Sequence, residues 1–352
     1  MSNLNNNLFR YATKELSQDA FICWLCSYAL EDADNSDAEL IRCGHMLVSE
    51  FLKKDNVEID DINDVILKDV QKQFGQIDIL LTAEYSGEVF KIIIEDKINS
   101  SEHDDQLNKY KSKFKNENVH LICIYLKTGF QSDLSEVNKA GYKLFDRKDF
   151  LSVLKSCNSQ NSILLSFLAF WEEFESIAQS YKEKPVTEWP DWQAVNGFYD
   201  EMKSFLEEFG YWAGYDYVPN PSGGFWGFWY GDYSCETIEI GGFKATIYLQ
   251  VETSWNYETN NYDIRICLKI SDSNKSKDEK LRLLRDIIVG IQSDYGFEKP
   301  SKLGYGQHVT TGIYKASIFD SNDFKETIIE SLEKYKLLVG KVNEKLKQDV
   351  SL

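Results

Sequence analysis

Long apolar runs are missing from this sequence of 352 residues, and so is a secretory start. No stretch stays apolar over the roughly 20 residues that a membrane-spanning helix needs. The N-terminal segment from Met1 to Asn7 lacks the basic start and apolar core of a signal peptide. We therefore expect a cytoplasmic protein with no part in the membrane.

A disulfide framework is missing as well. The seven cysteines are an odd number scattered along a long chain, whereas disulfide scaffolds are short and contain paired cysteines. Cys23 and Cys26 have the spacing of half a zinc site, and Cys43 with His45 could supply the other half. However, Cys23 and Cys26 lie in an apolar helical pattern, where cysteines usually serve as small core residues. We therefore reject a zinc site.

Positive charge is scarce. The chain has 39 lysines and arginines against 57 acidic residues, which gives a formal net charge of −18. So acidic a protein has no general attraction to a phosphate backbone, and this argues against a simple nucleic-acid-binding module. Basic residues are more frequent between Lys97 and Lys148. A local contact with phosphate is therefore permitted in that stretch.

The length and composition predict two globular domains. The chain is longer than one hydrophobic core usually serves, and 43% of its residues are hydrophobic and 27% charged. The polar, proline-containing stretch 181–188 is typical of a linker. Six of the eight tryptophans follow it. We expect one domain over residues 1–182 and an aromatic-rich domain over residues 186–352.

Apolar periodicity predicts an α/β first domain. A helix capped by Thr13 comes first, and later Ile92-Ile93-Ile94 makes a strand that is apolar on both faces. Such a strand belongs in the middle of a sheet that helices cover on both sides. The other expected strands are 65–70, 77–83, 119–126 and 142–145, and the other expected helices are 38–52, 102–114, 147–156 and 162–180.

The second domain has the pattern of an α+β fold, in which helices cover one side of an antiparallel sheet. It carries more strand aromatics than one buried face can hold, which favours a role in substrate recognition, in partner binding or in a homodimer. The expected strands are 225–230, 237–240, 244–252, 262–270 and 311–318, and the expected helices are 192–209, 277–295 and 323–347.

The residues that carry chemistry lie where the apolar strand ends. Side chains alternate along a strand, so Glu95 and Lys97 point to one face and Asp96 to the other. One strand earlier, Asp78 interrupts an apolar run. A hairpin that turns at 86–87 would bring Asp78 to Glu95. Two carboxylates so close favour a divalent cation, because without one they repel each other and one takes up a proton.

This arrangement predicts a magnesium site, in which manganese could replace magnesium. Asp78 and Glu95 would hold the ion, with the backbone carbonyl of Asp96 as a further ligand. The ion can polarise a phosphate and acidify a bound water. Lys97 can orient that water or offset charge in the transition state.

Asp78, followed after sixteen residues by Glu95-Asp96-Lys97, resembles the PD-(D/E)XK nuclease superfamily. The resemblance implies a restriction-endonuclease-like mixed sheet flanked by helices, and a metal-dependent phosphodiesterase. In that superfamily the Asp and the Glu bind magnesium and the Lys assists the attacking water. Ile77 stands where the superfamily's name expects proline, which is among the loosest parts of the signature.

Two flanking features extend the resemblance over about residues 8–180. Glu15, near the start of the first helix, stands where many members have a further active-site glutamate. Gln106 and Tyr110 match a QxxxY element of some branches and would share one helix face. Each of these two features also has an explanation that involves no catalysis. The helix dipole favours an acid such as Glu15 in a first turn, and Gln106 with Tyr110 suits a solvated helix face.

We therefore expect a metal-dependent nuclease that acts on nucleic acid, with DNA favoured over RNA. By analogy, such a domain joined to an aromatic module suggests bacterial defence or DNA processing. One alternative is an inactive nuclease fold kept for binding or scaffolding. Another is an acidic partner-binding protein, such as an inhibitor or a DNA mimic, which the strong negative charge favours.

Overall fold

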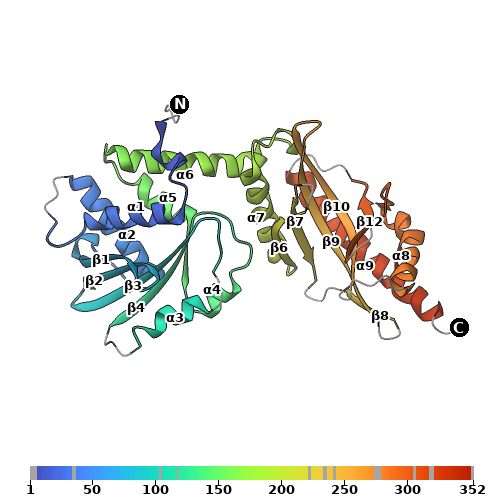
Figure 1. The fold of residues 1–352 in the computed structure, drawn as a ribbon, viewed down its shortest axis with the longest axis horizontal. Helices are drawn as coiled ribbons and strands as arrows, with labels where there is room; N and C mark the ends of the chain where they lie inside the picture. The colour runs from blue at the N-terminus through green and yellow to red at the C-terminus, as the bar shows by residue number, and fades with distance from the viewer. Residues whose placement is uncertain are drawn as a thin grey trace. The chain divides into compact units, whose positions relative to one another are not determined.

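The computed structural model describes residues 6–33, 37–102, 105–115, 117, 119–220, 223–232, 236–240, 243–272, 279–303, 307–316 and 321–349. The chain divides into two compact units, Met1–Glu175 and Ser176–Leu352, each with its own sheet (Figure 1). Within the described part, no helix is both long and apolar enough to cross a bilayer.

The N-terminal unit is built on a mixed sheet of five strands in the order β1-β2-β3-β4-β5. The first three strands are antiparallel, whereas β3, β4 and β5 are parallel. The mixed sheet expected from the sequence is therefore confirmed, with β3 at its centre. The strands are β1 (Ile66–Phe74), β2 (Ile77–Tyr85), β3 (Glu88–Lys97), β4 (His120–Lys127) and β5 (Lys143–Asp146).

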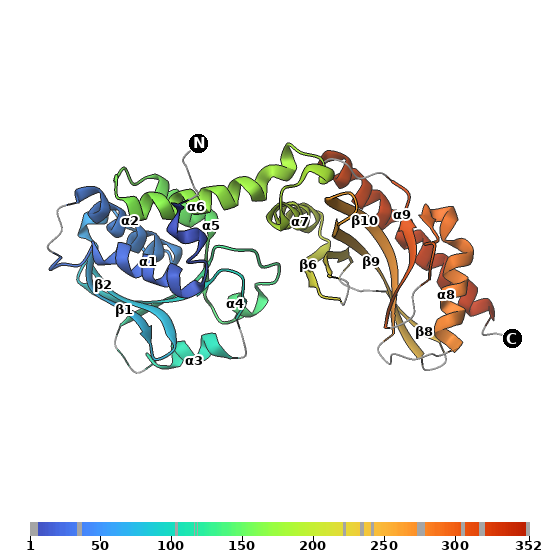
Figure 2. The ribbon, with the colours of Figure 1, turned by 45° about the horizontal axis from the view of Figure 1, so that its top comes forward.

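Helices cover both faces of this sheet (Figure 2). On one face lie α1 and α2, where Phe21 of α1 stacks on Phe167 of α6 with ring centroids 3.6 Å apart. On the other face, α3 and α4 pack on a core that includes Leu80, Ile93 and Tyr125. The helices are α1 (Glu15–Ser27), α2 (Ala38–Lys54), α3 (Gln106–Ser112), α4 (Ser135–Lys139), α5 (Arg147–Lys155) and α6 (Ser162–Gln179).

The start of α1 differs from the expectation. Lys14 stands at the N-cap position and its side chain accepts no hydrogen bond, so the prediction that Thr13 caps the helix is wrong. Thr13 lies one residue before the position from which a side-chain oxygen reaches the first free amides. The helix expected over 102–114 is also shorter, since α3 spans only Gln106–Ser112.

A two-residue hairpin sets the register between β2 and β3. Ser86 and Gly87 both have positive φ, at 53° and 79°, as a type I′ turn requires. The hairpin pairs Tyr85 with Glu88 and, further along, Ile79 with Ile94. The turn predicted at 86–87 is therefore present, and it carries β2 back to the end of β3.

The ends of β3 and β4 are held together by a very close backbone approach. The amide of Thr128 donates to the carbonyl of Lys97 at 3.2 Å. A Cβ atom on Gly129 would lie only 2.0 Å from the carbonyl oxygen of Ile98. Only glycine therefore allows the chain after β4 to approach the residue that follows Lys97.

The C-terminal unit contains an antiparallel sheet, as expected, in the order β11-β12-β10-β9-β7-β6 with β8 paired to the same edge of β9 as β7. Its longest strands form the β9–β10 hairpin (Figure 1). The strands are β6 (Trp212–Val218), β7 (Phe225–Gly231), β8 (Glu236–Ile240), β9 (Phe243–Asn256), β10 (Asn261–Asp272), β11 (Phe297–Glu298) and β12 (His308–Tyr314).

Long helices pack on one face of this second sheet. Tyr199 of α7 donates to the carbonyl of Trp226 at 3.1 Å, and Tyr335 of α9 donates to the carbonyl of Ile247 at 2.7 Å. Strand β6 was not predicted, because Gly214 and the acidic Asp216 interrupt its apolar pattern. The helices are α7 (Trp192–Glu208), α8 (Glu279–Ile291) and α9 (Ser321–Asp349).

We predict that Gly129→Ala destabilises the N-terminal unit by about 1–3 kcal/mol, because the new methyl group must displace the backbone at Ile98. Urea unfolding of the full chain measures this loss. Gly290→Ala is the control, since a Cβ at Gly290 in α8 meets nothing within 4 Å and alanine favours a helix. An unchanged free energy of unfolding for Gly129→Ala would contradict the close approach.

Candidate active site

Two charged side chains are buried together where β3 ends. Glu95 is fully buried and Lys97 is 7% exposed. They lie two residues apart on one face of the strand, and the Lys97 ammonium donates to Glu95 Oε1. Burying both charges is costly unless they are paired, so this ion pair is what permits β3 to end in charged residues inside the domain.

Asp78 joins this pair from the neighbouring strand. The pairing of Ile79 with Ile94 places Asp78 beside the end of β3. Its Oδ2 lies 3.7 Å from Lys97 Nζ and accepts the backbone amide of Asp96 at 3.0 Å. The structure therefore brings together Asp78, Glu95 and Lys97.

Gln106 and Tyr110 reach the same group from α3. Gln106 Nε2 donates to Glu95 Oε1 at 2.6 Å and to the Tyr110 hydroxyl at 2.7 Å. Both residues lie on one face of the helix, four positions apart. Gln106 thus touches the carboxylate directly, whereas the Tyr110 hydroxyl hydrogen-bonds to Gln106.

Glu15 binds the chain just after β3. Its Oε1 accepts the backbone amide of Ile98 at 3.0 Å and the hydroxyl of Ser100 at 2.6 Å. Glu15 therefore holds the chain that leaves β3, and it makes no direct hydrogen bond to Glu95 or Asp78 in the described residues.

The Asp96 carboxylate points away from Glu95, to the opposite face of β3. Gln18 of α1 donates to its Oδ1 at 2.6 Å. The Asp96 side chain is therefore not on the side of Glu95. This agrees with the expected alternation of side chains along the strand.

Burial changes the protonation of Glu95. Desolvation, followed by the negative charge of Asp78, raises the pKa of Glu95 to about 7, although Lys97 opposes the shift. Burial alone would lower the pKa of Lys97, but the charges of Glu95 and Asp78 outweigh it and the pKa is raised. The cluster therefore has an excess of negative charge that Lys97 does not fully balance.

The donor set suits a hard divalent cation. Glu95 Oε2 is buried and has no hydrogen-bond partner in the described residues, so this oxygen lacks the donor or cation that a buried carboxylate needs. Among those residues no three His, Cys, Asp or Glu side chains form a metal centre by themselves. Magnesium usually keeps several waters and needs only one or two protein carboxylates, which Asp78 and Glu95 can supply.

Sequence reasoning missed Asp19, which lies next to this cluster. Its side chain is almost fully buried and interacts with Asp96. Desolvation and the charge of Asp78 raise the pKa of Asp19 to about 6, and burial raises that of Asp96 well above its ordinary value. The sequence feature that could have revealed Asp19 is its spacing of four residues from Glu15. This spacing puts both acids on one face of α1.

Lys127 at the end of β4 was also missed. It is 4% exposed and its ammonium donates to the carbonyl of Ser100 at 2.5 Å. Burial lowers the pKa of Lys127 to about 8, against the attraction of Glu15 and Glu102. The parallel pairing of β3 with β4 sets Lys127 opposite Lys97.

The chain was compared with models of known protein families. Residues 8–180 match the model of the PD-(D/E)XK nuclease superfamily. The N-terminal domain belongs to this superfamily. No curated protein and no solved structure matches the chain.

Membership in the PD-(D/E)XK superfamily supports a nuclease-type function for this domain. It also agrees with the mixed sheet flanked by helices. Ile77 stands at the position of the superfamily's proline and is fully buried, as a member of the core beneath α3. An apolar residue at this position therefore has a packing role.

We predict that Asp19→Asn stabilises the metal-free protein above pH 6. The folded-state pKa of about 6 exceeds the ordinary 3.8, so Asp19 weakens the fold progressively as pH rises between these values and fully above them. The gain should be about 1–3 kcal/mol at pH 7.5 and small at pH 4. Urea unfolding in EDTA at both pH values measures it.

Asp64→Asn, which changes an exposed aspartate, is the matched control and should show no such gain. Equal stability of Asp19→Asn and the unaltered protein at pH 7.5 would contradict the burial of Asp19.

Proposed function

We propose that the N-terminal domain is a magnesium-dependent phosphodiesterase that cleaves nucleic acid, with DNA as the favoured substrate. The observation that carries this proposal is the buried group of Asp78, Glu95 and Lys97, in which Glu95 Oε2 has no hydrogen-bond partner within the described residues. Asp78 and Glu95 would hold the metal, together with the Asp96 carbonyl. The bound ion would polarise the phosphate and acidify a water.

Lys97 is assigned the role of assisting the attacking water. Its ammonium contacts Glu95 and lies 3.7 Å from Asp78, so it is held beside both proposed metal ligands. From this position it can orient a water and offset the negative charge that develops on the phosphate oxygens. The surrounding burial strengthens these electrostatic effects.

Gln106 is a positioning residue in this proposal. Its amide occupies Glu95 Oε1, which leaves Oε2 as the oxygen for the metal. Tyr110 fixes the Gln106 amide in turn. Glu15 supports the site by holding Ile98 and Ser100, immediately after Lys97.

The C-terminal domain is assigned to recognition of substrate or a partner, including a second copy of the chain. A cytoplasmic role in defence or in DNA processing is consistent with this arrangement by analogy only. The alternative is a nuclease fold retained for binding or scaffolding. The net charge of −18 favours it, because so acidic a protein has no general attraction to a phosphate backbone.

We predict that Lys97→Ala lowers nuclease activity at least about 100-fold, since an interaction made in the transition state is lost. The assay uses plasmid, single-stranded DNA and RNA with magnesium or manganese. Lys109→Ala removes an exposed lysine from α3 and should leave the rate unchanged. No cleavage of any substrate by the unaltered protein would favour the scaffold, as would equal rates for the two variants.

We also predict that the protein binds manganese through Asp78 and Glu95. Isothermal titration should show binding that Asp78→Asn and Glu95→Gln each weaken at least about 10-fold, because each removes an anionic ligand. Asp64→Asn is again the control, as an exposed acid outside the site. Lys97→Ala should still bind the ion, so loss of activity with metal retained separates the role of Lys97 from that of the carboxylates.

A further inference from the structure

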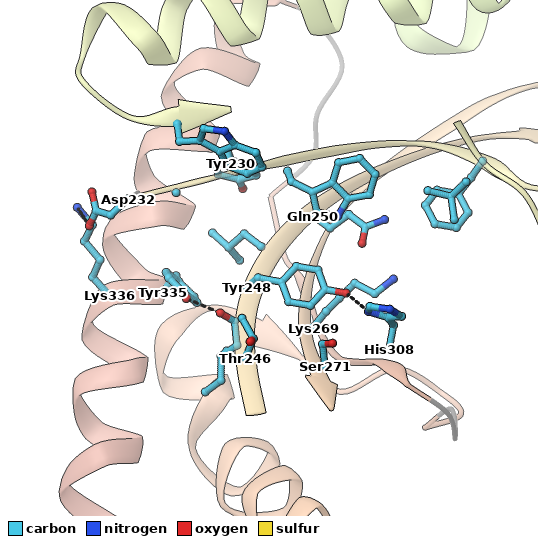
Figure 3. Close-up of a pocket in the computed structure, with 17 residues that line it drawn as sticks. Tyr230, Asp232, Thr246, Tyr248, Gln250, Lys269, Ser271, His308, Tyr335 and Lys336 are labelled. Carbon is cyan, nitrogen blue, oxygen red and sulfur yellow. Dashed lines mark hydrogen bonds and ion pairs between the residues drawn. The ribbon is translucent and has the colours of Figure 1, made fainter. Parts of the chain in front are cut away.

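The C-terminal domain contains a cavity of about 600 Å³ on its sheet (Figure 3). This volume lies in the range of small-molecule sites, which combine apolar walls with a few polar groups. Six of the residues that line it are Phe, Trp or Tyr, and five of these come from the strands β6, β7 and β9. The five are Trp212, Phe225, Trp229, Tyr230 and Tyr248.

Strand register explains why these side chains meet. Trp229 pairs with Gln250, and Tyr248 pairs with Lys269. Side chains of paired residues lie on the same face of a sheet, so all four belong to one face. Alternate residues of β7 and β9, among them Tyr230 and Leu249, also line the cavity and are buried.

Gln250 supplies an amide group to the wall of the cavity. It is only 2% exposed and lines the cavity, and its amide makes no hydrogen bond in the described part of the chain (Figure 3). Neither of its amide atoms is among the buried side-chain atoms that lack a partner, so the amide is open to the cavity and a ligand there can reach it. The amide offers both a donor and an acceptor, which calls for a ligand with a complementary polar edge.

The aromatic walls suit a flat ring. Trp229 lies over Gly227, where a Cβ atom would be 3.0 Å from the indole and 3.1 Å from Gln250 Nε2. Glycine thus brings the indole and the amide together at one place. Trp212 is 40% exposed, although tryptophan is usually covered, so its ring is available for stacking.

The charged residues that line the cavity are Lys269, Lys336 and Asp232, so the lining has one more positive than negative charge. Lys269 and Arg265 both bind Glu252, at 2.8 Å and 2.6 Å, so two cations share one carboxylate. Lys269 is 7% exposed and lines the cavity. At the other side, Lys336 and Asp232 form a balanced pair at 3.1 Å. A ligand with one or more negative charges would therefore complement Lys269.

We propose that this cavity binds a purine nucleotide, with adenine as the favoured base. The base stacks on Trp229, the Gln250 amide pairs with the donor and acceptor on one edge of adenine, and Lys269 attracts the phosphate. The nucleotide can be a free one or an unstacked unit of a single strand, since both present the same groups. This inference does not depend on nuclease activity of the N-terminal domain.

The experiment uses the full chain carrying Lys97→Ala, so that cleavage cannot remove the ligand. Tryptophan fluorescence and isothermal titration are recorded with AMP, ATP and CMP, and with six-nucleotide strands of dA and dT. We expect fluorescence quenching and binding of the adenine ligands at least tenfold tighter than of CMP or dT. Binding of AMP or ATP indicates a free nucleotide, whereas binding of the dA strand alone indicates a base in a strand.

Two substitutions locate the site. Gln250→Leu keeps the size of the side chain and removes the amide, and Trp229→Ala removes the stacking surface; each should weaken binding at least tenfold. Trp255→Ala is the control, because Trp255 is a half-buried tryptophan of β9 that does not line the cavity. Circular dichroism verifies that each variant is folded. If Trp229→Ala proves to be unfolded, the binding result for Gln250→Leu is used by itself to test the proposal.

Absence of binding at 1 mM of every ligand would overturn the proposal. Binding that both cavity variants retain would overturn it too, because the ligand would then occupy another part of the protein. Neither result bears on cleavage by the N-terminal domain, which is measured with Lys97 intact.

Discussion

The N-terminal domain depends on one buried ion pair, formed where an apolar strand ends in Glu95 and Lys97. Strand β3 has neighbours on both sides and helices over both faces, so its last residues have little access to water. A carboxyl group in such a place either takes up a proton or needs a cation and hydrogen bonds beside it. Lys97 supplies part of that charge, and the unpartnered Glu95 Oε2 shows that the requirement is not fully met by the described residues.

The surrounding structure serves to hold this pair. The Ser86-Gly87 turn fixes β2 against β3 and so carries Asp78 to the pair, while Gly129 lets the end of β4 close on Ile98. Gln106 donates to the Glu95 carboxylate, and Glu15 accepts the amide of Ile98 just after the pair. Backbone geometry, more than any single side chain, therefore determines the chemistry of the site.

Much of this arrangement could be predicted from local rules. Alternation along a strand separates Asp96 from Glu95 and Lys97, and helical spacing aligns Gln106 with Tyr110. What could not be predicted depends on contacts between distant segments: α1 brings Asp19 to Asp96, on the face of β3 opposite to Glu95, and the parallel pairing of β4 with β3 sets Lys127 opposite Lys97. The C-terminal cavity required the register of β7 on β9, which brings Trp229 to Gln250 and which the sequence pattern does not specify.

Because side chains alternate between the two faces of β3, an error in the register of this strand would affect both layers of the domain. A shift of β3 by one residue against β2 and β4 would turn Asp96 toward α3 and would turn Glu95 and Lys97 toward α1. Lys97 would move together with Glu95, but the pair would be separated from Asp78 and Gln106, and Asp96 would lose the hydrogen bond from Gln18. Correct register is therefore a single condition for stability and for assembly of the site, and a population of this domain that is folded but wrongly registered should be too unstable to persist.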